Sequence, residues 1–457
     1  MVVLEFIYQF AGAAVPAVIG REKMIGIKAI IQLLASFLAG GLSFLILVLS
    51  ARLFGPEILG QTAYFAGVLG LMFAFTDLGL SRAHVHFTAA RGGNPELAGF
   101  LVLKLPLLLL AILAAVIWAG RTTAPLVFFI LLANEVFFRL ADSLLISFEG
   151  QERVWPQNLL KTAAKICRLI AVIWLGYQLA TSLGYAFTFL IEAIWIFGGA
   201  VFLAKSWFNL SFNRQMVKRY LSYSLPLAAI IPLSYLQENS LVLMLNHWQG
   251  SAALGVYTAG FGLFGFIKSF SSSLMVYFFP RISRLNEIKD KASIQRYTDL
   301  AVKLSFWLLA PLILLLLLFS RWLVPLALGA NYLAAIDIFR IYLLGVLLLA
   351  IFAPYDHVLF ATNHHRGIVK INLLTTLLLL FLGWQLIPRF GGVGAAWANV
   401  IAWLVSGWCQ FQLLHQKTGL KFLTDWRLSQ LELKYLYGLF NSFSQAVFRA
   451  GRKKTGF

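Results

Sequence analysis

The sequence predicts an all-α polytopic membrane protein made of two similar six-helix halves. Its composition is strongly apolar, since 60% of the 457 residues are hydrophobic and only 12% are charged, against about 25% charged in an average globular domain. Apolar runs long enough to cross a bilayer, about 20 residues each, fill the chain and leave no room for a soluble domain. A glycine pattern that occurs twice predicts the two halves.

The repeated pattern begins at Gly55 and again at Gly250, an offset of 250 − 55 = 195 residues. At this one offset the sequence repeats a leucine and four glycines, namely Leu59/Leu254, Gly55/Gly250, Gly60/Gly255, Gly67/Gly262 and Gly70/Gly265. A second match, between 158–162 and 372–376, has an offset of 372 − 158 = 214, so the connections differ in length. A long internal repeat in an apolar chain favours a transporter whose substrate path lies between two halves.

The same glycines predict a packing surface. Gly60, Gly67 and Gly70 are spaced by seven and three residues, which places them on one stripe of a helix. Small residues on such a stripe let a neighbouring membrane helix approach closely. We therefore expect the second and eighth spans to pack closely through these stripes.

Residues 1–26 form a lead before the first strong apolar span. The stretch 6–20 is apolar, but Glu5 precedes it and no positive charge does, which is the wrong polarity for a secretory signal. The lead is either a short interfacial segment or sequence upstream of a natural start at Met24.

Twelve predicted spans follow, six in a first bundle at 27–212 and six in a second bundle at 213–414. Both bundles begin on the same side because an even number of spans separates them, so the repeats run parallel about an axis along the membrane normal. The spans are predicted at 27–51, 59–80, 98–119, 124–148, 160–179, 183–204, 221–245, 252–277, 300–319, 336–360, 368–387 and 393–414.

Lys and Arg residues gather in alternate connections, which orients the chain. One side has only Arg52, Arg121, Arg321 and Arg389, whereas the other side has all the remaining connecting cations. Because basic residues in short loops stay cytoplasmic, we predict both termini to be cytoplasmic in a cell inner membrane. The net charge of +19 is thus assigned to membrane orientation and not to nucleic acid binding.

Several function classes lack the residues that they need. Cys167 and Cys409 lie inside apolar runs, so neither a disulfide framework nor a cysteine metal site is available. His364 and His365 are adjacent and lack a spaced third ligand, so no metal site is predicted. No phosphate-binding glycine loop or nucleotide fold is present, so we expect neither ATP use nor another cofactor. External connections of a few residues leave no room for catalytic carboxylates.

Charges inside the spans each cost at least about 2.5 kcal/mol and call for a partner or a function. Glu135, Arg139 and Asp142 are spaced by four and three residues in the fourth span, so they share one helical face and can compensate one another. Asp337 and Arg340 form a similar pair near the outer end of the tenth span. We interpret both groups as structural ion pairs, the first one holding the first half together.

Glu192 and Glu238 have no opposite charge within a helical turn. They are candidates for a protonatable or cation-binding site; the other interpretation is a protonated carboxyl that is hydrogen-bonded to a neighbouring helix. Glu238 is the candidate for ion coupling because polar Asn239 follows it, and because Pro226 and Pro232 precede it. Prolines inside a helix kink it, which predicts a hinge in the seventh span.

A cluster of polar groups is predicted at the cytoplasmic ends of the spans. Lys268 and Ser272 lie in the inner half of the eighth span, and Lys28, Asp77 and Arg82 lie at the same level of nearby spans. Lys268 either snorkels to the inner interface or receives a phosphate together with serine hydroxyls. In the second case these residues would form an inward-facing vestibule of positive balance that suits an anionic headgroup.

The tail at 415–457 is polar and basic. Leu428, Leu431 and Tyr435 fall at helical spacing beside Arg427 and Lys434, which predicts an amphipathic helix on the inner leaflet, with the closing cations against anionic lipids. A partner-binding tail is the alternative.

Five segments resemble one family. Residues 51–60 together with 77–79 resemble the first-span exit and second span of oligosaccharide-lipid flippases, 254–257 with 279–283 resemble the eighth span, and 387–396 resemble the approach to the twelfth. These flippases belong to the multidrug/oligosaccharidyl-lipid/polysaccharide exporter superfamily. The resemblance implies two bundles arranged as a V, a central cavity lined mainly by the first, second, seventh and eighth spans, and alternating access without ATP hydrolysis.

The resemblance also implies a substrate, a polyprenyl-diphosphate-linked oligosaccharide that is moved from the inner to the outer leaflet for surface polysaccharide export. Membrane lipids and a polysaccharide polymerase or export proteins are the further partners it implies, and it supplies no catalytic residue. A cation-coupled multidrug exporter of the same superfamily is the alternative. A membrane enzyme that acts on lipid-linked glycan is the alternative of another class.

Overall fold

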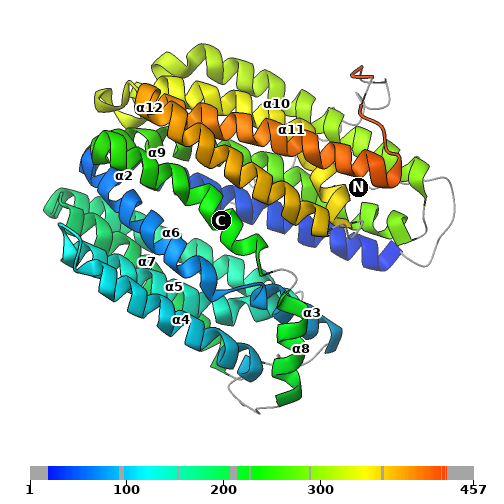
Figure 1. Cartoon of the computed structure of the whole chain (residues 1–457), viewed down its shortest axis with the longest axis horizontal. Helices are drawn as coiled ribbons and strands as arrows, with labels where there is room; N and C mark the ends of the chain where they lie inside the picture. The colour runs from blue at the N-terminus through cyan, green and yellow to red at the C-terminus, as the bar shows by residue number, and fades with distance from the viewer. Residues whose placement is uncertain are drawn as a thin grey trace, which may run out of the picture.

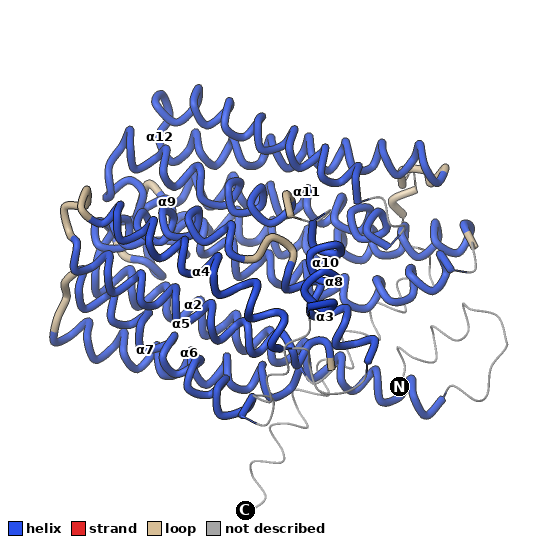
Figure 2. The backbone as a smooth tube through the Cα atoms, turned by 60° about the horizontal axis from the view of Figure 1, so that its bottom comes forward, coloured by secondary structure: helices blue, strands red, loops and turns tan. Residues whose placement is uncertain are grey.

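The computed structural model describes residues 19–91, 97–151, 154–205, 214–225, 228–287, 290–361, 365–423, 425–427 and 429. Within these ranges the regular elements are all helices (Figure 2), so the predicted all-α fold class is confirmed. The elements are α2 (Ile19–Phe73), η1 (Ala74–Thr76), α3 (Leu80–Arg91), α4 (Leu97–Ala119), α5 (Pro125–Gly150), α6 (Val154–Gln178), α7 (Ser182–Ala204), α8 (Arg214–Ser224), α9 (Ile230–Glu287), α10 (Lys291–Leu328), η4 (Ala330–Tyr332), α11 (Ala335–Ala361) and α12 (His365–Thr418).

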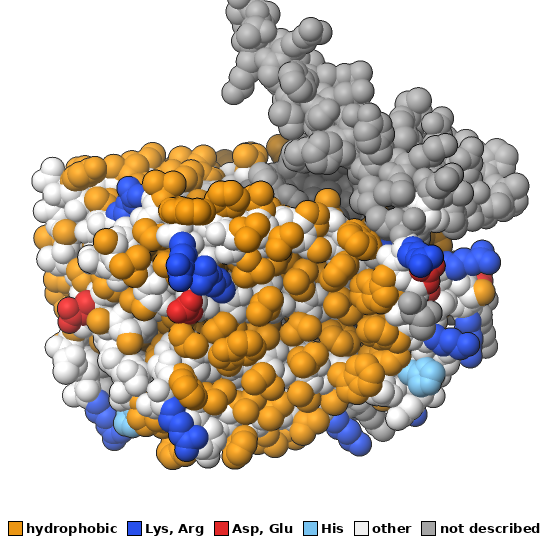
Figure 3. All heavy atoms as spheres, turned by 90° about the horizontal axis from the view of Figure 1, so that it is seen from above, with side chains coloured by type: hydrophobic (Ala, Val, Ile, Leu, Met, Phe, Trp, Pro, Cys, Tyr) orange, Lys and Arg blue, Asp and Glu red, His pale blue; other side chains and the backbone are white. Residues whose placement is uncertain are grey.

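Seven helices in the described ranges are long and apolar enough to cross a membrane. Three of their apolar stretches, Leu38–Thr76, Ile230–Lys268 and Gly367–Thr418, contain 39, 39 and 52 residues, whereas one crossing takes about 20. Each of these three therefore has the length of two spans. The face drawn in Figure 3 is covered largely by hydrophobic side chains, as a surface against lipid tails requires.

The three long helices are each kinked at a glycine. Gly55 in α2 has φ 78° and ψ 172°, Gly250 in α9 has φ 78° and ψ 176°, and Gly391 in α12 has φ 55° and ψ −132°. Positive φ favours glycine because glycine has no Cβ. Each kink separates two of the predicted spans, so the connection between them is reduced to a glycine bend.

The helices form two groups that meet along α2 and α9. Figure 1 shows α4, α5, α6 and α7 in one group and α10, α11 and α12 in the other. Helices α2 and α9 pack against each other; α2 also contacts both groups, and α9 contacts α10, α11 and α12. The groups lie close together at the end that has the kinks and spread apart toward the end that has α3 and α8. We call the first the kink end, defined by Gly55, Gly250 and Gly391, and the second the open end.

The start of the seventh span differs from the prediction. The seventh span was expected to begin at Leu221, but residues 221–224 belong to the separate basic helix α8, and α9 begins at Ile230. Pro232 consequently lies in the first turn of α9, where a proline removes no helical hydrogen bond, so it does not interrupt the helix as expected. Pro226 and the expected tail helix lie outside the described residues.

The core of the second half is built from buried aromatic side chains. The hydroxyls of Tyr257 in α9 and Tyr342 in α11 are 2.6 Å apart, and Asn399 in α12 donates a hydrogen bond of 3.2 Å to Tyr342. Phe264 packs between the rings of Tyr342 and Trp403, with centroid distances of 4.9 and 5.4 Å. Polar atoms are thus paired within an otherwise apolar core.

Candidate functional site

The two copies of the glycine pattern pack against each other at the kink end. A Cβ added at Gly60 would lie 1.7 Å from the carbonyl oxygen of Ser251, and a Cβ added at Gly255 would lie 1.7 Å from the carbonyl oxygen of Pro56. These contacts are equivalent under the repeat because 60 + 195 = 255 and 56 + 195 = 251. The backbones of α2 and α9 therefore touch, and the seam between the halves is closed at this level.

Gly67 and Gly262, about two helical turns further from the kinks, are also closely packed. A Cβ at Gly67 would lie 3.2 Å from Cγ1 of Val242, and a Cβ at Gly262 would lie 2.6 Å from Cδ2 of Leu47. This pair of contacts is again related by the repeat, because 47 + 195 = 242. The close approach predicted for the glycine stripes is confirmed at these positions.

Hydrogen bonds also tie α2 to the second half at the kink end. Arg52 donates from Nε to the carbonyl oxygen of Ala327 at 2.8 Å and from Nη2 to that of Leu326. These carbonyls end α10, and a cation stabilises a helix C-terminus. Tyr332 donates from its hydroxyl to the carbonyl oxygen of Ala51 at 3.3 Å. The kink end is thus fastened by polar contacts as well as by glycine packing.

Arg139 of α5 reaches across the seam to α9. Its Nη2 lies 2.6 Å from Oε1 of Glu135, and its Nη1 donates to the hydroxyl of Tyr235 at 2.7 Å. Asp142, the third member of the expected group, instead interacts electrostatically with Lys104. The pair of Glu135 and Arg139 therefore links the two halves and does not only hold the first half together, as predicted. Helical spacing cannot reveal a partner 96 residues away.

Glu192 of α7 also has a partner in another helix. Arg168 of α6 lies with Nη1 3.0 Å from Oε2 of Glu192, and its guanidinium carbon is 3.6 Å from the ring centroid of Phe189. One turn earlier in α6, Lys165 donates to the hydroxyl of Ser43 in α2. The first half therefore presents cations of α5 and α6 to the helices that form the seam.

Asp77 is buried in an internal ion pair. Its Oδ1 lies 3.5 Å from Nζ of Lys104 in α4 and accepts a hydrogen bond of 3.2 Å from the backbone N–H of Ser81. Arg82, the next residue in α3, is exposed. The structure thus separates two expected vestibule residues, since Asp77 is neutralised inside the first half and Arg82 faces outward at the open end.

Three of the other expected site residues, Lys268, Glu238 and Asn239, lie at different levels of α9. Lys268 is exposed, with Nζ 5.8 Å from the ring centroid of Trp403 in α12. Glu238 is exposed as well, and Asn239 donates to the carbonyl oxygen of Tyr235 at 2.9 Å. The side chains of Lys28 and Ser272 lie outside the described residues.

Asp337 and Arg340 of α11 form a surface pair. Nη1 of Arg340 lies 3.5 Å from Oδ1 of Asp337, whose side chain is 69% exposed, and Nε donates to the hydroxyl of Ser320 at 2.7 Å. Exposed pairs contribute about 0–1 kcal/mol. The ion pair within α11 is therefore weak, and it is the hydrogen bond from Arg340 to Ser320 that links α11 to α10.

Side chains suited to a metal ion do not gather in the described part of the chain, where no group of three His, Cys, Asp or Glu residues is close enough to hold one. A shallow hollow of about 370 Å³ lies between α2, α4 and α9 near the kink end, lined in part by Tyr64, Trp118, Asn246 and His247. The chemistry of the seam is thus that of charged and hydrogen-bonding side chains.

Sequence reasoning missed three buried or half-buried cations. Lys104, Lys165 and Arg168 contribute to the predicted excess of cations on the cytoplasmic side, yet they lie inside α4 and α6. Their partners are in other helices, so no local spacing identifies them. Their position within otherwise apolar helical stretches was the available signal.

Two family models and one curated relative match parts of the sequence. A family model described as "Polysaccharide biosynthesis protein" matches residues 153–337, and one described as "Lipid II flippase MurJ" matches residues 250–450. The capsular polysaccharide biosynthesis protein CapF of Staphylococcus aureus is 22% identical over 382 residues, which are 81% of this chain and 94% of that protein.

Solved structures share the fold. The lipid II flippase MurJ in an inward closed conformation matches with a TM-score of 0.69 at 15% identity, over 92% of this chain and 99% of that one. A multidrug resistance MATE family transporter in its inward-facing conformation matches with a TM-score of 0.66 at 14% identity, over 86% and 98%. The chain is thus similar in sequence to polysaccharide biosynthesis proteins and to a lipid II flippase family, and it shares the fold of the solved MurJ and MATE transporters.

Proposed function

We propose that the protein is a flippase that moves a polyprenyl-diphosphate-linked oligosaccharide from the inner to the outer leaflet by alternating access. In this proposal the chain crosses the membrane twelve times in two bundles, 27–212 and 213–414, arranged as a V with both termini cytoplasmic. The observation that carries the proposal is a seam that is closed by backbone packing at the kink end and bordered by cations of the first half. The open end would then face the cytoplasm.

The cations of the seam have the chemistry that a diphosphate needs. Arginine binds phosphate through two parallel N–H···O bonds, and Arg139 and Arg168 each hold one carboxylate now. A substrate diphosphate would compete with Glu135 and Glu192 for these guanidinium groups. The exchange keeps each cation paired, which lowers the cost of passing charge through an apolar region.

The open end would receive the headgroup first. Lys268 and Arg82 are exposed there, and we retain them as the first phosphate contacts. Lys28, Asp77, Ser272 and Asn239 remain candidates for the vestibule, with Asp77 acting through Lys104 in the observed conformation.

One observation favours a cation-coupled exporter as the second candidate. Glu238 is an exposed carboxylate on α9, three residues after Tyr235, which also binds Arg139 across the seam. A carboxylate at this place could couple proton or sodium movement to the separation of the halves. We expect Glu238→Gln to alter the pH or sodium dependence of transport in vesicles; an unchanged dependence excludes Glu238 as the coupling site.

Reconstituted flipping of a fluorescent polyprenyl-diphosphate-linked oligosaccharide tests the proposal. Lys268→Ala and Arg82→Ala should reduce the flipping rate while the folded protein remains in the membrane, and Arg121→Ala, at an exposed position near the kink end, should not. Wild-type rates in both of the first two variants would remove the vestibule. Mass spectrometry of the lipid after flipping separates transport, which leaves it chemically intact, from enzymatic conversion.

A further inference from the structure

Helix α8 is fastened to the first half through one of its faces. Met216, Tyr220 and Ser224 are spaced by four residues and are all buried, so they lie on one helical face. The hydroxyl of Tyr220 is 2.8 Å from Nδ1 of His84 in α3, and Nε2 of the same histidine is 2.7 Å from the hydroxyl of Ser147 in α5. Three helices are thus joined through one buried imidazole.

A second aromatic contact fixes the rim of this interface. The rings of His86 in α3 and Tyr223 in α8 are stacked, with centroids 4.7 Å apart and an interplanar angle of 16°. Phe87 packs against Tyr220 and Tyr223 at centroid distances of 5.2 and 5.8 Å. These contacts hold α8 in a set orientation on α3, so its remaining faces have defined positions.

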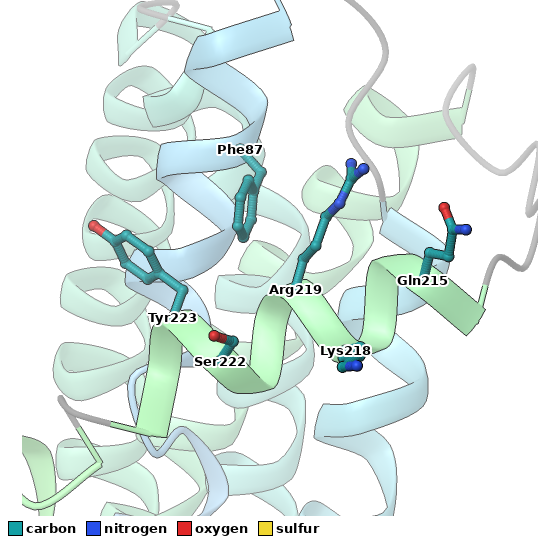
Figure 4. Close-up of a pocket in the computed structure, with 6 residues that line it drawn as sticks. All are labelled: Phe87, Gln215, Lys218, Arg219, Ser222 and Tyr223. Atoms are coloured by element: carbon teal, nitrogen blue, oxygen red, sulfur yellow. The ribbon is translucent and has the colours of Figure 1, made fainter.

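A groove of about 580 Å³ lies between α3 and the second face of α8. Figure 4 shows Phe87 of α3 between Arg219 and Tyr223 of α8. Both basic side chains of the groove are exposed, and none of its six lining residues is acidic. They are Phe87, Gln215, Lys218, Arg219, Ser222 and Tyr223.

The third face of α8 is an exposed apolar ridge. Leu221 in α8 and Leu225, which directly follows the last residue of α8, are spaced by four residues and are 49% and 76% exposed. A helix that combines such a ridge with a basic face lies in the interface of a membrane, with its apolar side chains between lipid tails and its cations at headgroup level. The ridge therefore places the groove at the depth of the phosphate groups.

We propose that the groove between α3 and α8 binds the phosphate headgroup of an anionic membrane phospholipid. Lys218 and Arg219 contact the phosphate, the hydroxyl of Ser222 donates a hydrogen bond to it, and the acyl chains pack along Leu221 and Leu225. A phospholipid satisfies the basic face and the apolar ridge together, which a free anion does not. The site is separate from the proposed transport path, because it lies between α3 and α8 and not between α2 and α9.

Native mass spectrometry of the full chain in detergent, titrated with phosphatidylglycerol or phosphatidylcholine, tests the proposal. We expect Lys218→Gln/Arg219→Gln to weaken phosphatidylglycerol binding by about tenfold, since each cation near an anionic lipid contributes measurably, and to leave phosphatidylcholine binding unchanged. Leu221→Ser/Leu225→Ser should weaken both lipids. Lys417→Gln/Lys421→Gln is the matched control, because it removes two exposed cations from the second half.

Two outcomes would overturn the proposal. Equal phosphatidylglycerol affinity in the groove variant and in the control variant would show that general charge, and not the groove, attracts the lipid. An equimolar polyprenyl diphosphate could displace phosphatidylglycerol from the wild type but not from the groove variant. This result would assign the groove to the transported lipid. Unfolding temperatures of all three double variants should match the wild type, because the replaced side chains are exposed.

Discussion

Gly60 and Gly255 make equivalent contacts at the kink end. Gly70 and Gly265, about three helical turns further along the same stripes, do not. A Cβ at Gly70 would lie 3.1 Å from Nδ2 of Asn239, whereas a Cβ at Gly265 would meet no atom within 4 Å. The two halves are thus matched where their backbones touch and differ toward the open end. Equivalent packing of α2 and α9 closes the seam at the kink end. Toward the open end, where the contacts are not equivalent, the two halves can have different side chains.

The charges of the two halves differ in the same way. With the offsets of the later spans, 372 − 158 = 214 and 394 − 184 = 210, Arg168 corresponds to Leu382 and Glu192 to Ala402. The second half therefore forms an equivalent helix pair without the ion pair that the first half has. The fold of the second half therefore does without such a pair, and the proposed function assigns the pair of Arg168 and Glu192 to the passage of substrate.

The largest effect is expected where the halves are matched. Gly60→Ala and Gly255→Ala should each destabilise the protein by about 3 kcal/mol or more, because the new methyl group would overlap a backbone carbonyl that cannot move aside. Gly265→Ala should be neutral or stabilising by up to about 1 kcal/mol from helix propensity. Thermal unfolding of the purified protein measures the stability of all three variants. Unequal losses of stability in Gly60→Ala and Gly255→Ala would show that the two contacts are not equivalent.

A smaller effect is expected from the unmatched charges. Glu192→Ala alone should cost about 3 kcal/mol at most, because it leaves the half-buried guanidinium of Arg168 without its carboxylate. Arg168→Leu/Glu192→Ala copies the second half and should recover most of this loss. A double variant that is no more stable than the single one, in the same unfolding assay, would show that the first half needs the pair for its fold.

The smallest effect is expected at the contact between α3 and α8. Helix α3 follows the apolar stretch Leu38–Thr76 and lies outside it. Burial, helped by the charge of Lys104, lowers the pKa of His84 to about 4, from 6.5 in an accessible histidine. Below pH 6.5 the unfolded chain therefore binds the proton more readily than the folded chain. The contribution of His84 to the free energy of unfolding is complete above this pH and is lost as the pH falls toward 4.

At pH 5 the expected loss from His84 is about 2 kcal/mol relative to pH 8. His84→Gln should be less stable at pH 8, because Tyr220 and Ser147 lose a partner, but it should lack this part of the acid dependence. Unfolding temperatures measured from pH 8 to pH 5 test this. The same acid dependence in both proteins would show that His84 is not its origin.

The sequence predicted those features that depend on local pattern. Composition and span length predicted the helical stretches, and the spacing of Gly60 and Gly255 from their neighbours predicted a close-packed stripe. The long helices α2, α9 and α12 each join two predicted spans, because a glycine with positive φ is enough to turn the chain.

The site could be predicted only in part, because its contacts are not local. Arg168 and Glu192 are 24 residues apart and Arg139 and Tyr235 are 96 apart, whereas helical spacing relates residues only three or four positions apart. Leu221 was assigned to a span because it begins an apolar run, and only the contacts of α8 with α3 place it on a separate helix.

Flipping by Arg168→Leu/Glu192→Ala tests the central claim most directly, because this variant gives the first half the residues of the second. Reconstituted in vesicles with a fluorescent polyprenyl-diphosphate-linked oligosaccharide, it should unfold at a temperature close to that of the wild type and flip the lipid at least about tenfold more slowly, as expected when a charge-assisted phosphate contact is lost. A well-folded double variant that flips the lipid at the wild-type rate would contradict the assignment of these charges to the substrate path.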